Sequence, residues 1–206
     1  MLGHIIIHAL IEVWKGWEVR RALKRWIAAR EFTEKANPPG QYDGYPTRVV
    51  VGQHLSHMYE FHVSMSHGAN WQGVFLATSD APWKPKAGLE PAPTGDLDFD
   101  NAVQIWIEPG VTRPEWLMNP DVQRALGTLS NHAAFVVESQ FALLWMKWNI
   151  EHPDFVEEAM KSVLNAASRV CNTLNAAIRG EPIPSFLEHR KPQPKQIKLP
   201  ARRKSR

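Results

Sequence analysis

The first 36 residues carry a helical pattern of apolar positions. From residue 19 onward the apolar side chains recur on one helix face, and they are Val19, Ala22, Leu23, Trp26 and Ile27. Before Gly16 the apolar residues occur on all sides, which is typical of a helix end that is buried or covered by a partner. The pattern stops at the Asn-Pro-Pro-Gly sequence of residues 37–40, which breaks regular structure. We therefore predict an N-terminal helix over about residues 4–36.

A two-residue periodicity replaces the helical pattern in the middle of the chain. Between Leu55 and Met65 the odd-numbered side chains are mainly apolar and the even-numbered ones mainly polar, which predicts a strand with one buried face. The β-branched run at residues 48–51 predicts a separate short strand or a bulge before it. Residues 73–78 and 102–108 have the composition of two further strands. We expect the first of these to form a hairpin with the alternating segment.

The C-terminal half has the pattern of helices. Asn119 and Pro120 form a favourable N-cap and first-turn pair, from which we predict helix to about Trp148. A second helix is predicted from Pro153 to Gly180, which supplies a C-terminal stop. Its apolar stripe comprises Phe155, Val156, Ala159, Met160, Val163, Ala167, Val170, Leu174, Ala177 and Ile178. The short link between the two helices predicts an antiparallel helical hairpin.

Together these patterns predict an α+β fold with an N-terminal helix, a small, mainly antiparallel sheet of about three or four strands and a C-terminal antiparallel helical hairpin. A length of 206 residues suits one ordinary domain with tails. We divide the chain into an N-terminal amphipathic helix (1–36), a single α+β body (37–188) and a tail (189–206). The single Cys excludes an internal disulfide, and 8 Phe, 9 Trp and 3 Tyr exclude disorder of the whole chain.

The net charge of +3 conceals a strong asymmetry along the chain. The body carries 9 Lys and Arg against 17 Asp and Glu, a net of −8, whereas the tail carries 8 cations and no acidic residue. A basic, proline-containing and disordered tail on an acidic body is typical of binding to nucleic acid or to an acidic partner. The alternative is that the tail lies on its own body. The predicted contact residues are Arg190, Lys191, Lys195, Lys198, Arg202, Arg203, Lys204 and Arg206.

A proline-rich segment separates two of the predicted strands. Residues 81–95 contain four prolines and two glycines, which exclude regular structure there. Loops of this length are often functional or mobile. Trp83 lies between Pro82 and Lys84 in this loop and is difficult to explain as a core residue. We therefore predict that Trp83 contacts a partner.

Four histidines, residues 54, 57, 62 and 67, fall within fourteen residues. Side chains alternate along a strand, so the four cannot all meet at one metal ion. His62, with Glu60 beside it, is the most plausible metal-binding pair. The acidic segment 96–101 begins like a calcium loop, but Asn101 and Ile107 stand where that loop needs Gly and Glu.

The sequence lacks the usual marks of a cofactor site or of a nucleophile. It has no Gly-rich phosphate loop and no Gly-x-Ser-x-Gly elbow, and Cys171 lies on an apolar helix face, where a small buried side chain is expected. We expect no cofactor and a non-enzymatic interaction or assembly protein. Its basic tail would contact nucleic acid or an acidic partner, and its first helix would pack in a homo-oligomer or larger assembly.

Two alternatives to this function stay open. The first is a small metal-dependent hydrolase or nuclease that uses His62 with Glu60, or with Asp98 and Asp100. The second is a peripheral membrane component held by the Trp-containing and basic first helix. The apolar start of the chain is too short to span a bilayer and lacks the charge and cleavage pattern of a signal peptide. We therefore expect no transmembrane segment and a cytoplasmic location.

Overall fold

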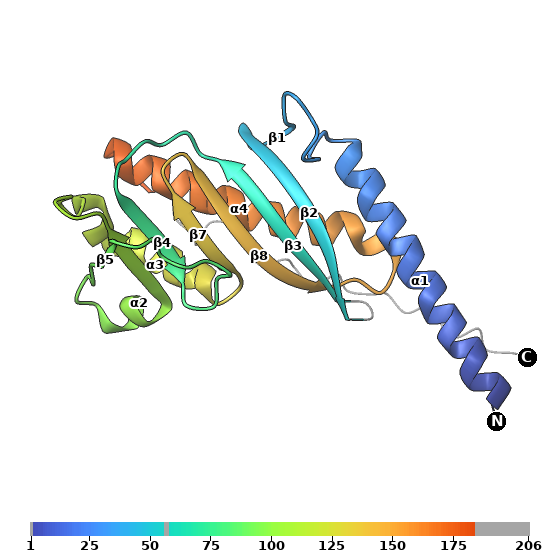
Figure 1. The fold of residues 1–206 in the computed structure, drawn as a ribbon. Coiled ribbons are helices and arrows are strands. Elements are labelled where there is room, and N and C mark those ends of the chain that lie inside the picture. Colours follow the sequence, from blue (N-terminus) through green and yellow to red (C-terminus); the bar gives the residue numbers. More distant parts are fainter. Residues whose placement is uncertain (1, 56–57, 184–206) are drawn as a thin grey trace, which may run out of the picture.

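Helices and antiparallel strands make up the chain, which confirms the predicted α+β fold (Figure 1). The computed structural model describes residues 2–55 and 58–183. The helices are α1 (Leu2–Ala28), α2 (Leu97–Ala102), α3 (Pro120–Ser130) and α4 (Val156–Arg179), with 3-10 turns η1 (Glu115–Met118) and η2 (Pro153–Phe155). The strands are β1 (Gln41–Tyr42), β2 (Tyr45–Leu55), β3 (Met58–Ser66), β4 (Val74–Thr78), β5 (Glu90–Pro91), β6 (Val103–Ile107), β7 (Ala134–Glu138) and β8 (Phe141–Asn149).

The strands form one antiparallel sheet in the order β1-β2-β3-β8-β7-β4-β6-β5. Strand β3 lies between β2 and β8, where Phe61 opposes Val51 on one side and Met146 on the other. The predicted alternation in this strand is confirmed. Its buried side chains are Tyr59, Phe61, Val63 and Met65. His62 between them is exposed, so β3 presents one apolar face and one polar face.

Helix α4 covers the apolar face of β3 and β8 and supplies much of the core (Figure 1). Its buried stripe includes Val163, Ala167, Val170 and Leu174, at the helical spacing that the sequence predicts. Gly180 ends the helix in the left-handed conformation, with φ of 68°, which a glycine adopts without steric cost.

Helix α1 packs on the body through its C-terminal half. Val19, Leu23 and Ile27 are buried in the common core, and α1 contacts α4 and η2. Its N-terminal half projects away from the sheet and from α4 (Figure 1). The helix ends at Ala28, eight residues before the predicted end, and turns follow as far as β1.

The predicted helical hairpin at residues 120–178 is wrong in its first half. Helix α3 begins at the predicted Asn119 cap but ends at Ser130, and β7 and β8 follow. Ala, Leu and Met are good helix formers, which is why residues 134–148 suggested a helix. The side chains of β8 nevertheless alternate between buried and half-buried from Phe141 to Met146. Pairing with β3 on one side and β7 on the other outweighs the weak local preference.

The predicted pairing of residues 55–65 with 73–78 is also wrong. Strand β3 pairs with β2 and β8, whereas β4 pairs with β6 and β7. The β7-β8 hairpin stands between them in the sheet. The sheet is therefore larger than the three or four strands expected, because a segment predicted as helix supplies its centre.

Candidate functional site

The polar face of the sheet brings the predicted metal pair together with residues of β8. His62 opposes Val50 on β2 and Trp145 on β8, and Glu60 opposes Lys147. The Nε2 atom of His62 lies 3.3 Å from Oε1 of Glu60. The His62 ring also meets the Trp145 ring edge-on, with 6.3 Å between centroids. Glu60 and His62 form an ion pair when the imidazole is protonated.

The surroundings of Glu60 and His62 offer few further metal ligands. Over residues 2–55 and 58–183, no group of three or more His, Cys, Asp or Glu side chains is arranged to hold a metal ion. Zinc sites normally use at least three protein ligands. Of the other clustered histidines, His54 and His57 have side chains outside the described part of the chain. Metal binding by the pair stays a prediction.

The acidic segment at residues 96–101 has a capping role. Oδ1 of Asp96 accepts hydrogen bonds from the backbone N–H groups of Asp98 and Phe99 at the start of α2. The carboxylate of Asp100 accepts from the backbone and hydroxyl of Thr94 and from the backbone of Gly95. Burial raises the pKa of Asp100, but these hydrogen bonds outweigh it and lower the pKa below its ordinary value. These bonds account for both carboxylates as local structure.

His67 lies inside the protein, away from the polar sheet face. Its Nδ1 accepts a hydrogen bond from the backbone N–H of Ala69, so Nε2 carries the proton and donates to the carbonyl of Glu138. The ring stacks on Trp71, with 5.1 Å between centroids. Burial lowers the pKa of His67, and hydrogen bonding to backbone carbonyls offsets part of this effect. His67 is thus a neutral structural residue.

This environment predicts a pH-dependent stability. Above pH of about 6.5 the imidazole is neutral in both the folded and unfolded chain, whereas below it the unfolded chain binds the proton more readily. Unfolding should therefore become easier as the pH falls, by up to about 1.4 kcal/mol per pH unit until the lowered folded pKa is reached. Urea unfolding of the wild type and of His67→Gln at several pH values measures the difference in slope. His132→Gln, at an exposed position, is the control, and equal slopes for all three proteins would contradict the prediction.

The side chain of Trp83 packs against strand β4 of its own chain. Its ring stacks on Phe75 of β4 with a centroid separation of 6.3 Å, and the ammonium of Lys86 lies 5.6 Å from the centroid of the same Phe75 ring. The proline-rich segment therefore covers part of the sheet, and its residues Glu90 and Pro91 form β5, where no regular structure was expected. Trp83 is half-buried, and its contact with a partner stays a prediction.

A groove that the sequence did not indicate lies between α3, α4 and the end of β8. Its volume is about 580 Å³. Its lining residues are Ala125, Leu126, Thr128, Leu129, Asn131, His132, Met146, Lys147, Trp148, Ser162, Asn165, Ala166, Arg169, Val170 and Thr173. Residues 145–148 were predicted as helix, so the groove that the end of strand β8 forms with α3 and α4 could not be foreseen.

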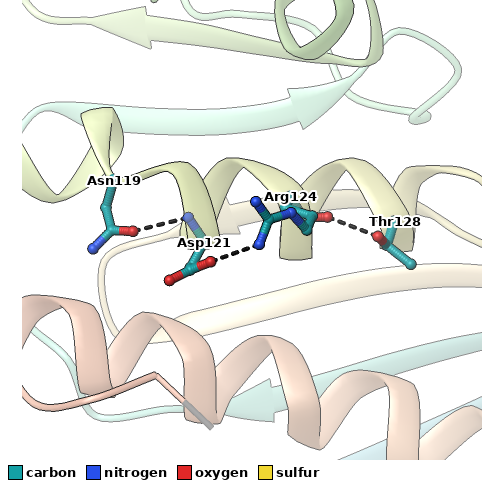
Figure 2. Close-up of polar contacts among 4 residues, drawn as sticks. All are labelled: Asn119, Asp121, Arg124 and Thr128. Atoms are coloured by element: carbon teal, nitrogen blue, oxygen red, sulfur yellow. Dashed lines mark hydrogen bonds and ion pairs between the residues drawn. The ribbon is translucent and has the colours of Figure 1, made fainter. Parts of the chain in front are cut away.

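The hydroxyl groups along α3 are bonded to the backbone of that helix. Thr128 donates to the carbonyl of Arg124 at 2.7 Å, and Ser130 donates to the carbonyl of Gly127 at 2.7 Å. Figure 2 shows the first of these bonds, together with the Asn119 cap and the ion pair between Asp121 and Arg124. A hydroxyl activated as a nucleophile needs a base as its hydrogen-bond partner. These two hydroxyls have carbonyl partners instead.

Cys171 is fully buried on α4, as its apolar neighbours predicted. Burial raises the pKa of its thiol to about 12. A thiolate, the reactive form of cysteine, therefore does not form near neutral pH. Its role is to fill the core.

The N-terminal helix carries the most exposed aromatic side chains of the described structure. Trp14 is 59% exposed and Trp17 is 56% exposed, and Val13 beside them is 72% exposed. The guanidinium of Arg21 lies 5.2 Å from the centroid of Trp17. We call Val13, Trp14 and Trp17 the α1 strip. It lies where the helix leaves the body.

No helix in the described part of the chain is both long enough and apolar enough to cross a membrane. The eight predicted tail contacts, from Arg190 to Arg206, lie outside the described residues. Their contact with nucleic acid or an acidic partner therefore stays a prediction.

Comparisons with known proteins add little to this picture. No protein-family model and no curated protein matches the chain. Among solved structures, the mycobacterial trehalose monomycolate transport factor A is similar over 70% of this chain and 79% of its own, with 14% identity and a TM-score of 0.30. A likeness of this size carries no argument about function.

Proposed function

We propose that the protein is a non-enzymatic interaction protein that self-associates through α1 and contacts nucleic acid or an acidic partner through its basic tail. The observation that carries the proposal is the exposed α1 strip on a helix whose C-terminal half packs on the body through one buried face. The net charge of +8 in residues 189–206 supports the second contact.

The α1 strip is costly to leave in water. Full burial of a large apolar side chain contributes about 1.5–3 kcal/mol, and Trp14 and Trp17 each keep more than half of their surface exposed. Tryptophan is enriched among the residues that dominate protein interfaces. The preceding residues 2–11 are apolar apart from His4 and His8, so the strip continues a helix end suited to a partner. A second α1 offers the same apolar surface.

We predict that the double substitution Trp14→Ser and Trp17→Ser dissociates the assembly. Loss of two interface tryptophans, at about 2 kcal/mol or more each, should raise the dissociation constant about 1000-fold or more. Analytical ultracentrifugation of the full chain over a concentration series measures this change. Leu97→Ser is the matched control, because Leu97 is 77% exposed on α2, away from α1.

The same proteins separate self-association from membrane attachment. Tryptophan beside arginine, as with Trp17 and Arg21, also suits an anionic membrane surface. Flotation with anionic liposomes tests that alternative directly. A full-length chain that stays monomeric at every concentration, yet floats with liposomes unless the strip is substituted, would replace self-association with the membrane reading.

A further inference from the structure

The groove between α3, α4 and β8 combines an apolar floor with a cation at its rim. Buried apolar side chains form the floor, namely Ala125, Leu126, Leu129, Met146 and Val170. Arg169 of α4 lines the same groove and is exposed. Lys147 of β8 borders the groove, but it belongs to the polar sheet face, opposite Glu60. The volume of about 580 Å³ falls within the range of about 300–1,000 Å³ typical of small-molecule sites.

The charge of the groove is opposite to that of the body around it. Residues 37–188 carry a net charge of −8, yet none of the fifteen lining residues is acidic. Within the described chain, neither Arg169 nor Lys147 forms an ion pair. Arg169, a cation without an ion-pair partner in the described chain, lies beside an apolar surface, which suits a ligand that supplies both a negative charge and an apolar chain.

The remaining polar groups of the lining favour the same ligand. The Oδ1 atom of Asn165 accepts a hydrogen bond from the hydroxyl of Tyr42 at 2.7 Å. The NH₂ group of Asn165 therefore remains as a hydrogen-bond donor. The hydroxyl of Thr128 is already donated to the carbonyl of Arg124. Thr128 therefore keeps only acceptor lone pairs, whereas Asn165 keeps a donor one helical turn from Arg169, and donors recognise an anion.

We propose that this groove binds a single-chain amphiphile with an anionic head group. The apolar chain lies along the floor, and the head group stays at the rim with Arg169. The lining of the groove includes no residue of the α1 strip, so the proposal does not depend on self-association through α1.

Isothermal titration calorimetry of the full chain with dodecanoate, below the concentration at which it forms micelles, tests the proposal. We expect saturable binding with one site per chain, and at least tenfold weaker binding of dodecanol, which lacks the charge. Arg169→Ala should weaken dodecanoate binding about 10-fold or more, the effect of losing a hydrogen bond to a charged group, and leave dodecanol unchanged. Dodecyl phosphate distinguishes a preference for phosphate from one for carboxylate.

Two further variants distinguish binding in the groove from non-specific binding of the amphiphile elsewhere on the protein. Arg124→Ala is the matched control, because Arg124 is exposed on the adjacent α3 and pairs with Asp121 outside the groove (Figure 2). It should bind dodecanoate as the wild type does. Ala166→Trp should fill the groove and abolish binding of both amphiphiles, with folding checked by circular dichroism.

Three results would overturn the proposal. The first is the absence of saturable dodecanoate binding to the wild type. The second is an equal loss in Arg169→Ala and Arg124→Ala. The third is undiminished binding in folded Ala166→Trp together with lost binding in the Trp14→Ser, Trp17→Ser variant, which would place the amphiphile on α1.

Discussion

Replacement of Leu174 by alanine should lower the free energy of unfolding by about 2–5 kcal/mol, the range for a buried leucine that leaves a cavity. Leu174 is 0% exposed and belongs to the stripe of α4 that faces the common core. The sheet on one side and the helix backbone on the other limit how far the site can collapse. Urea unfolding followed by circular dichroism gives the free energy.

A surface substitution on the same helix provides the control. Lys161 forms an exposed i,i+4 ion pair with Glu157, with 2.9 Å between Nζ and Oε1. Pairs of this kind contribute about 0.3–0.5 kcal/mol, so Lys161→Ala should change stability little. A loss for Leu174→Ala that is no larger than the control value would show that this stripe is not what stabilises the body.

Removal of residues 190–206 should abolish salt-sensitive binding of the protein to DNA or RNA. The deleted segment holds eight cations and no acidic residue, and each phosphate neutralised on duplex DNA adds roughly 0.9 to the slope of log affinity against log salt. Engagement of half of the cations gives a slope of about −3 to −4. Fluorescence anisotropy with labelled duplex and single-stranded probes over a salt series measures the slope.

A second substitution distinguishes nucleic acid from the acidic body as the tail's partner. Changing Arg202, Arg203, Lys204 and Arg206 to Gln keeps the tail length and should reduce the magnitude of the slope by roughly half. If the tail lies on the body instead, truncation should alter thermal stability and leave nucleic-acid binding unchanged. Absence of any binding of the full chain at micromolar concentration and low salt would end the nucleic-acid proposal.

The sequence was most informative where a local signal and the tertiary environment agree. The alternation around Phe61 matched β3 because one face of the sheet is covered by α4 and the other is open. Asn119 and Gly180 marked true helix boundaries because capping depends on the residues at the cap itself. The apolar side of α4 could be listed in advance for the same reason.

The sequence was misleading where long-range pairing decides the structure. Residues 141–149 contain Ala, Leu, Met and Trp in an order that suits a helix as well as a strand. They become the central strand β8 because β3 and β7 both pair with them. Strand β7 directly precedes β8 in the chain, but β3 comes from residues 58–66, so no local pattern records the pairing with β3.

By itself, the sequence determined the α+β class, the amphipathic character of α1 and α4, the buried place of Cys171 and the concentration of positive charge after residue 188, because each depends on neighbouring residues or on composition. Only the tertiary structure decided the sheet order, the burial of His67 against the carbonyl of Glu138, which lowers its pKa, and the groove between α3, α4 and β8. Those features join residues far apart in the chain. They form through packing of one element on another, which a local pattern does not record.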